Sequence, residues 1–151
     1  MELAEIGKNI LTNCMNVKPG ENVLIVTDDE KYAIGQALYQ AAKLLKAEAM
    51  LMTMPAREVS GQEPPSVVAA AMKAADVVIC PMKTSITHTR AKIEAAEAGA
   101  RIATMPGITE EMFAMGAMTA DYSRVMALTE QVTDLLTKAN TARIEKDGHV
   151  L

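Results

Sequence analysis

The fold is decided by the stretch from Val23 to Leu45, VLIVTDDEKYAIGQALYQAAKLL. Its first four residues form a continuous apolar run, the form expected of a strand that is buried on both faces. A helix is predicted over about residues 30–46, because apolar side chains recur there at helical spacing, at Ile34, Leu38, Ala41, Ala42 and Leu45. A short apolar strand followed by a longer amphipathic helix is the repeating unit of a parallel α/β sheet.

The same alternation extends in both directions from this unit. An opening helix is predicted over about residues 2–16, which Lys18-Pro19-Gly20 ends. Further strands are predicted at about 48–54, at Val77-Val78-Ile79-Cys80, which Pro81 should cut off, and at 101–105. Further helices are predicted from Pro65 to Ala75, over about 89–98 with Gly99 at its end, from Thr109, and over about 121–138.

These elements predict an α/β fold with an open, mostly parallel, Rossmann-like sheet and helices on both faces. Right-handed crossovers favour the flavodoxin-like strand order 2-1-3-4-5, with a fifth strand at Thr141-Ala142-Arg143-Ile144. Asp147-Gly148 is typical of a two-residue hairpin turn, yet only three residues follow it. We therefore expect an α/β domain at 1–140 and, at 141–151, the start of a β-hairpin that leads into a missing C-terminal domain. The alternative is a short terminal edge strand.

The composition is that of an ordinary globular domain, with 151 residues, of which 50% are apolar and 23% charged. The net charge is −4 and no stripe of lysine or arginine is visible, so nucleic acid is not an expected partner. Neither a membrane-spanning run nor a signal peptide is apparent, and we expect a cytoplasmic protein without a membrane partner. Cys14 and Cys80 lie in unrelated contexts, which argues against a disulfide or a structural zinc site.

One loop has the composition of a binding site. Ligands bind open α/β sheets beyond the carboxyl ends of the strands, and the loop after the third strand is the richest in polar side chains. We assign Ser85, Thr87 and His88 there as substrate-binding candidates, and one hydroxyl of the 84–87 segment should also cap the next helix. With Lys83 and Arg90 nearby, the loop could hold a carboxylate or phosphate. The alternative is that the hydroxyls only cap and the charges are solvated.

Other candidate groups are weaker. Asp28, Asp29 and Glu30 could bind a cation or a ribose hydroxyl, but helix capping and the helix dipole explain three acids at a helix start. The motifs GxGxxG, GxxxxGK[ST], GxSxG and HExxH are absent from the sequence. We therefore assign no catalytic, cofactor-binding or metal-ligating residue within 1–151, and we expect the isolated chain to be inactive.

Three segments occur in a characteristic order: VKPGENVLI at 17–25, SITHTRA at 85–91, and GARIATMPGITEEM at 99–112. Together they resemble the N-terminal domain of the thermophilic metallo-aminopeptidases, the aminopeptidase T and aminopeptidase S-like leucyl aminopeptidases. The resemblance implies a two-domain enzyme that removes N-terminal residues from peptides. Its C-terminal domain would carry a dinuclear centre of zinc, cobalt or manganese, built from Glu, His, Tyr and Asp side chains.

The same resemblance implies a peptide substrate, contact with the protein's own C-terminal domain, and a homodimer. The family of this resemblance also contains enzymes similar to dihydroxypyridine dioxygenases, which use a mononuclear iron site in the equivalent C-terminal region. The main expectation is thus the non-catalytic front domain of a metallo-aminopeptidase. The alternatives are the front domain of a dioxygenase-like enzyme, and a free-standing Rossmann-like module that binds a small anion or nucleotide through residues 85–88.

Overall fold

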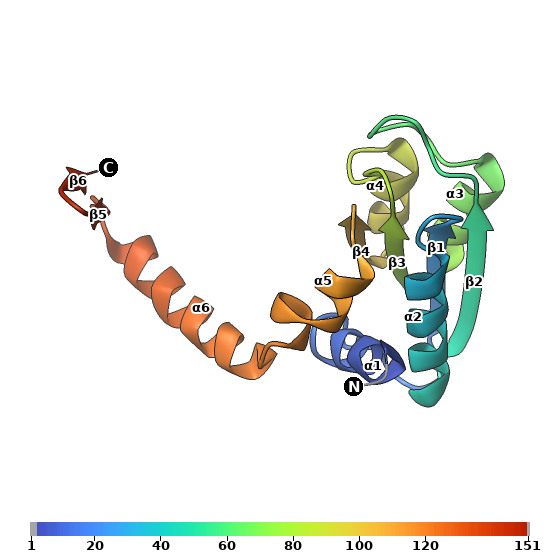
Figure 1. Ribbon diagram of the computed structural model, residues 1–151, viewed down its shortest axis with the longest axis horizontal. Helices are drawn as coiled ribbons and strands as arrows, with labels where there is room; N and C mark the ends of the chain where they lie inside the picture. The colour runs from blue at the N-terminus through green and yellow to red at the C-terminus, as the bar shows by residue number, and fades with distance from the viewer. Residues whose placement is uncertain (1–2, 151) are drawn as a thin grey trace. The chain divides into compact units, whose positions relative to one another are not determined.

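The computed structural model describes residues 3–150, which divide into two compact units, one ending at Thr119 and the other beginning at Ala120. The first unit contains a parallel sheet flanked by helices (Figure 1). Its elements are α1 (Leu3–Asn13), β1 (Asn22–Asp28), α2 (Tyr32–Leu44), β2 (Glu48–Met54), α3 (Ser66–Ala74), β3 (Val77–Met82), α4 (Arg90–Glu97), β4 (Arg101–Pro106), α5 (Glu110–Ala114) and the 3-10 helix η1 (Gly116–Thr119).

The four strands form one sheet in the order β2-β1-β3-β4, and all pairs are parallel. This confirms the predicted fold class and the 2-1-3-4 part of the strand order. β1 and β3 occupy the centre and are buried along nearly their whole length. Their position explains the continuous apolar runs in the sequence, since a central strand with helices on both faces has no solvent side.

Alternate residues of the strands belong to two apolar clusters, one on each face of the sheet. Val23 and Ile25 pack with Ile6 of α1 and Leu38 of α2, whereas Leu24 packs on the opposite face in the cluster that α3 and α4 complete. This alternation is what the pleat of a strand imposes. None of the helices described in residues 3–150 has both the length and the apolar character needed to span a membrane.

The prediction that Pro81 cuts off the third strand is wrong, because β3 continues through Pro81 to Met82. β1 pairs with β3 only as far as Ile79, whereas β4 pairs with β3 through Met82. Pro81 therefore lies where β3 has a paired neighbour on one side only, and a missing N–H group is tolerated at such an edge. The Pro81 carbonyl accepts a hydrogen bond from Thr27 Oγ1 at 3.0 Å.

The second unit differs from the prediction of a fifth strand. Residues 141–144 form no strand and are exposed. The unit instead consists of α6 (Tyr122–Lys138) and a two-stranded antiparallel hairpin, β5 (Glu145–Lys146) and β6 (His149–Val150). The predicted Asp147-Gly148 turn is confirmed, with φ of 52° and 81°. Strands this short have too little apolar surface to extend the pairing. The expected division at residue 140 stays a prediction.

Candidate functional site

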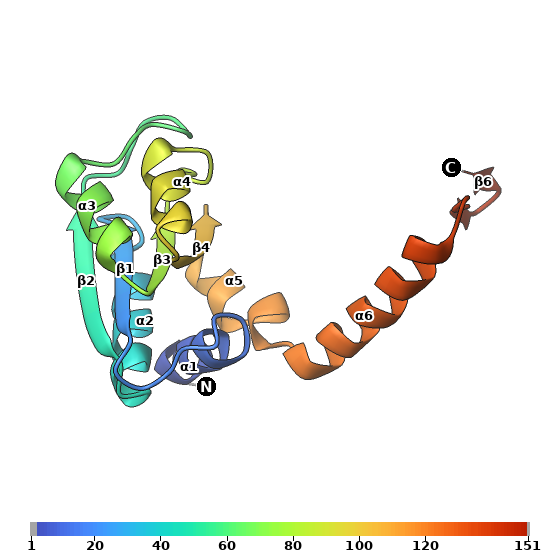
Figure 2. The same cartoon turned by 180° about the vertical axis from the view of Figure 1, so that it is seen from behind.

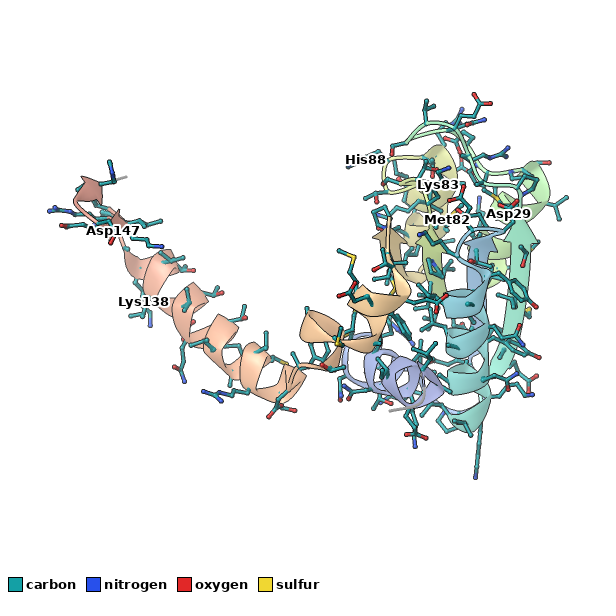
Figure 3. The ribbon with its side chains drawn as sticks, viewed as in Figure 1. Asp29, Met82, Lys83, His88, Lys138 and Asp147 are labelled. Atoms are coloured by element: carbon teal, nitrogen blue, oxygen red, sulfur yellow. The ribbon has the colours of Figure 1, made fainter. Side chains whose placement is uncertain are left out.

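The carboxyl ends of the four strands lie at one edge of the sheet, where the loops after β1, β2, β3 and β4 meet. Figure 3 labels Asp29, Met82, Lys83 and His88 in this region. Open α/β sheets bind ligands at this edge, particularly between neighbouring strands whose crossovers turn to opposite faces. In this chain those strands are β1 and β3.

A buried carboxylate lies between the ends of β1 and β3. Asp28 has no exposed surface, and its Oδ1 accepts from the backbone N–H of Lys31 at 3.0 Å. Its Oδ2 accepts from the backbone N–H of Lys83 at 2.6 Å. In nucleotide-binding sheets, backbone N–H groups at this position commonly donate hydrogen bonds to a phosphate. Here they donate to the Asp28 carboxylate instead, and the charge of this carboxylate would repel an external anion.

The neighbouring acids also bind other loops. Asp29 Oδ1 accepts from the Ala56 N–H at 3.0 Å, and Glu30 Oε1 pairs with Lys83 Nζ at 2.6 Å. The hydrogen bond that Lys83 Nζ donates to Glu30 raises the pKa of Lys83, and the Coulombic attraction of Glu30 adds to it. The capping interpretation of these acids is wrong, because α2 has no side-chain cap at its N-cap residue, Lys31. Their function is to join the loop after β1 to the loops after β2 and β3.

The structure brings two of the predicted site residues together. Ser85 Oγ donates to Thr87 Oγ1 at 2.9 Å, and Thr87 N–H donates to Ser85 Oγ at 3.2 Å. Thr87 Oγ1 also shares a hydrogen bond of 2.9 Å with Thr104 Oγ1 of β4. Sequence reasoning missed Thr104, although a hydroxyl inside an otherwise apolar strand was an available signal. The result is a half-buried chain of three hydroxyls at the ends of β3 and β4.

The start of α4 differs from the prediction. Its N-cap is Thr89 rather than a hydroxyl of the 84–87 segment, and Thr89 Oγ1 accepts from the Lys92 N–H at 3.3 Å. The two carboxylate oxygens of Glu63 accept from the N–H groups of the first two residues of α4, at 2.6 and 3.2 Å. The helix terminus that was expected to hold an external carboxylate or phosphate therefore already binds a carboxylate of this chain.

Glu63 belongs to the long loop 55–65, which the sequence left without a role. This loop also binds the loop after β3 through its backbone. The Gly61 N–H donates to the Ser85 carbonyl at 2.8 Å, and the Ser85 N–H donates to Ser60 Oγ at 3.2 Å. Gly61 adopts a φ of 86°, which favours glycine at this turn. The loops after β1, β2 and β3 are thus connected to one another by hydrogen bonds.

His88 is separate from this network. Its side chain is exposed and makes no hydrogen bond or ion pair among the residues that the structure describes. Figure 3 shows it projecting outward from the loop before α4. The assignment of Ser85, Thr87 and His88 as substrate contacts stays a prediction.

The larger hollows of the first unit lie along the edge strands. One, of about 700 Å³, is formed by the end of β4 with α5 and η1, and four methionines line it: Met105, Met112, Met115 and Met118. Another, of about 630 Å³, lies beside β2. A hollow of only about 220 Å³ lies between the loops after β1 and β4, lined in part by Glu30, Lys31 and Thr109. At the carboxyl edge of the sheet, the larger hollow thus lies at the end of β4, and only a small one lies between the loops after β1 and β4.

The residues present do not fit a metal centre. Within residues 3–150, no group of three or more His, Cys, Asp or Glu side chains could hold a metal ion. Burial raises the pKa of Cys80 to about 12, which keeps its thiol protonated and unsuited to ligate a metal. A metal implied by a related enzyme would need ligands from another part of the protein.

The fold and these contacts define a Rossmann-like α/β domain in which Asp28 and Glu63 occupy N–H groups at the carboxyl edge of the sheet. The family model described as NicX, 2,5-dihydroxypyridine 5,6-dioxygenase, matches residues 2–148, and the chain belongs to this family. A comparison with curated protein sequences gives no significant match.

Three solved structures are similar. The 2,5-dihydroxypyridine dioxygenase from Pseudomonas putida KT2440 has a TM-score of 0.57 and 18% identity, over 69% of this chain and 33% of that chain. Wild-type AmpT, an aminopeptidase T, from Thermus thermophilus has a TM-score of 0.45 and 13% identity, over 69% and 35%. A chorismate mutase/shikimate 5-dehydrogenase fusion protein from Clostridium acetobutylicum has a TM-score of 0.40 and 13% identity, over 89% and 61%. This chain thus spans about a third of the first two proteins.

These comparisons change the order of the functional hypotheses. The dioxygenase alternative is supported by the family match and, for the fold, by the Pseudomonas structure. The aminopeptidase expectation is matched only by the similarity to AmpT, and a TM-score of 0.45 does not support a shared function. The expected zinc, cobalt or manganese centre loses its main support with it.

Proposed function

We propose that this chain is the front, non-catalytic domain of a ring-opening dioxygenase that acts on 2,5-dihydroxypyridine or a similar dihydroxylated aromatic ring. The observation that carries the proposal is the family match, which extends over residues 2–148. The metal and its ligands belong, in this proposal, to a part of the enzyme that follows residue 151. Bound there, the metal supplies the activation of dioxygen.

Within this proposal, the carboxyl edge of the sheet faces the substrate. The hydroxyls of Ser85, Thr87 and Thr104 are already aligned in a hydrogen-bonded chain. A hydroxyl in such a chain can turn its proton toward a hydroxyl oxygen of a dihydroxylated ring without leaving its neighbour unpaired. The exposed ring of His88 supplies a second donor. Asp28 and Glu63 already accept hydrogen bonds from backbone N–H groups near this hydroxyl chain. Because these N–H groups are not free to bind a phosphate, the edge favours a neutral, hydroxylated substrate.

The test compares the 151-residue chain with a longer polypeptide that contains it together with its downstream coding region. Loss of 2,5-dihydroxypyridine absorbance and oxygen uptake are measured with added ferrous iron. We expect turnover by the longer polypeptide and none by the chain alone. Turnover by the chain alone would place the metal ligands within residues 1–151 and contradict the proposal. Hydrolysis of leucine-p-nitroanilide by the longer polypeptide, without dioxygenase activity, would restore the aminopeptidase hypothesis.

The role of His88 has its own test in the longer polypeptide. His88→Ala should lower kcat/KM by more than twofold, which corresponds to more than about 0.4 kcal/mol of transition-state stabilisation. The matched control is His149→Ala, since His149 is also exposed but belongs to β6 of the second unit and not to the loop before α4. A loss below twofold for His88→Ala, with the fold intact, would end the assignment of this loop as a substrate contact.

A further inference from the structure

Methionine side chains are concentrated in the hollow at the end of β4. This hollow, of about 700 Å³, is lined by four of the twelve methionines of the chain: Met105, Met112, Met115 and Met118. Figures 1 and 2 show, from opposite sides, that α5 leads away from β4 on the side opposite β3. The hollow lies where β4, α5 and η1 meet, and all of its lining residues belong to the first unit. We call it the methionine hollow.

Three of these methionines recur at intervals of three residues. Met112 lies in α5, Met115 is the C-cap residue of α5, and Met118 lies in η1. Side chains three residues apart lie on the same side of an α-helix and of a 3-10 helix. This interval is consistent with the placement of all three in the wall of one hollow, which Met105 of β4 completes.

Burial divides the four methionines into two pairs. Met105 and Met118 are half-buried and pack against the apolar cluster that contains Ile6 and Leu38. Met112 and Met115 are 59% and 56% exposed. Apolar burial explains the first pair but not the second, because an exposed side chain gains little free energy from the hydrophobic effect. Two thioethers held by packing thus share a hollow with two that water reaches.

The sulfur atom of methionine selects a particular class of metal ion. A thioether is a neutral, soft ligand, which suits Cu(I), whereas Mg²⁺, Ca²⁺ and Mn²⁺ prefer oxygen ligands. The lack of a His, Cys, Asp and Glu group within residues 3–150 does not concern such a site, because methionine sulfur is a ligand of a different kind. Among the residues that line the hollow, Glu111 alone is charged, and its carboxylate favours a cation.

We propose that the methionine hollow is a binding site for a soft monovalent metal ion, Cu(I), for which Ag(I) can substitute. Met112, Met115 and Met118 supply three sulfur ligands, and Met105 approaches from β4. A methionine side chain is unbranched and has three rotatable bonds, so the exposed Met112 and Met115 can close on the ion. Because three thioethers carry no charge, the ion keeps its positive charge, which Glu111 offsets. This site does not depend on the proposed dioxygenase function, since it needs neither dioxygen nor an aromatic ring.

Titration with Ag(I), followed by NMR of the chain labelled with carbon-13 in its methionine methyl groups, tests which residues bind. A Cys14→Ser background removes an exposed thiol, itself a soft ligand, and a nitrate buffer avoids precipitation by chloride. The methyl signals of the four hollow methionines should shift and saturate at one Ag(I) per chain. Met50 and Met126, which are 42% and 61% exposed outside the hollow, should not shift. Equal shifts at Met50 and Met126 would show unspecific association and overturn the proposal.

Competition for Cu(I) with the chelator bicinchoninate, without oxygen and in the same background, tests the affinity. Met112→Leu and Met115→Leu each remove a sulfur ligand but nearly conserve side-chain volume. Each should weaken Cu(I) binding by about tenfold or more. The matched control is Met126→Leu on α6, which should change the affinity by less than about twofold. Urea unfolding of each variant checks that the fold is intact.

Three results would contradict the site. The first is that the chain does not compete with bicinchoninate for Cu(I) at all. The second is that Met112→Leu and Met115→Leu both bind as tightly as the parent. The third is that Met126→Leu loses as much affinity as the hollow variants. Excess Zn²⁺ should not displace the ion, because Zn²⁺ prefers thiolate, imidazole and carboxylate ligands to thioethers.

Discussion

Replacing Asp28 with alanine tests whether its buried carboxylate holds the carboxyl edge together. The carboxylate accepts the N–H groups of Lys31 and Lys83, one from the loop after β1 and one from the loop after β3. Alanine leaves both N–H groups without an acceptor. No neighbouring side chain replaces the carboxylate, because Asp29 and Glu30 already bind Ala56 and Lys83 Nζ.

The size of the effect follows from the burial of these groups. An N–H group that is buried without an acceptor costs about 1–3 kcal/mol. Both N–H groups are only partly buried, so water reaches them to some extent, and the two together should cost about 2–4 kcal/mol of unfolding free energy. A domain has about 5–15 kcal/mol in total, so this is a large share. With an m-value of about 2 kcal/mol per M, the urea midpoint should fall by about 1–2 M.

The assay is urea unfolding followed by circular dichroism, with the m-value checked for a change. Asp29→Ala is the matched control, because it removes one exposed hydrogen bond, to Ala56, and should cost less than about 1 kcal/mol. Asp28→Asn should fall between the two, since its amide offers only one acceptor oxygen. An unfolding free energy of Asp28→Ala within about 0.5 kcal/mol of the wild type would refute the structural role of this carboxylate.

Three further predictions concern other parts of the chain. The Arg101 guanidinium donates a hydrogen bond to Glu21 and holds the pKa of Glu21 below the usual 4.5. The wild type should therefore be more stable than Glu21→Gln above pH 4.5, and this difference in unfolding free energy should disappear as the pH falls through the folded-state pKa. Urea titrations of both proteins at stepped pH would measure it. At pH 8, iodoacetamide should modify exposed Cys14 in the native protein and Cys80 only after unfolding, because burial raises the Cys80 pKa to about 12; peptide mass spectrometry that found native Cys80 modified at a similar rate would contradict this. A chain that ends at Thr119 should unfold within about 0.5 kcal/mol of the 151-residue chain, since both apolar clusters lie before that residue and α6 has no buried residue; a larger loss by calorimetry would refute it.

Much of the fold was predictable because its central strands are buried on both faces. The four-residue run Val23–Val26 and the run beginning at Val77 have no polar position, and such runs, separated by helical patterns, specify a parallel sheet. The course of β3 past Pro81 was not predictable, because it depends on where β1 stops pairing with β3. The sequence of residues 141–144 has strand character, but local propensity does not form a strand without a pairing partner.

The candidate site was predictable in place but not in its contacts. The rule for parallel sheets selects the loop after β3, and Ser85 and Thr87 do interact there. The groups that satisfy this region come from distant positions: Asp28 bonds a residue 55 positions away, and Glu63 bonds one 27 positions away. No local pattern marks such pairs. The capping prediction failed for a simpler reason, because Thr89 lies one residue before α4 and the earlier hydroxyls do not.

The hydrogen bonds among the loops after β1, β2 and β3 affect how this edge would bind anything. Ordering a flexible loop on binding costs conformational entropy, which is subtracted from the affinity. Here Asp28, Asp29, Glu63 and the backbone of Ser85 hold the loops in one arrangement before any partner arrives. The edge therefore acts as a preorganised surface, and selectivity at it would come from fit rather than from induced closure. The loops after β1, β2 and β3 are therefore not suited to act as a mobile lid.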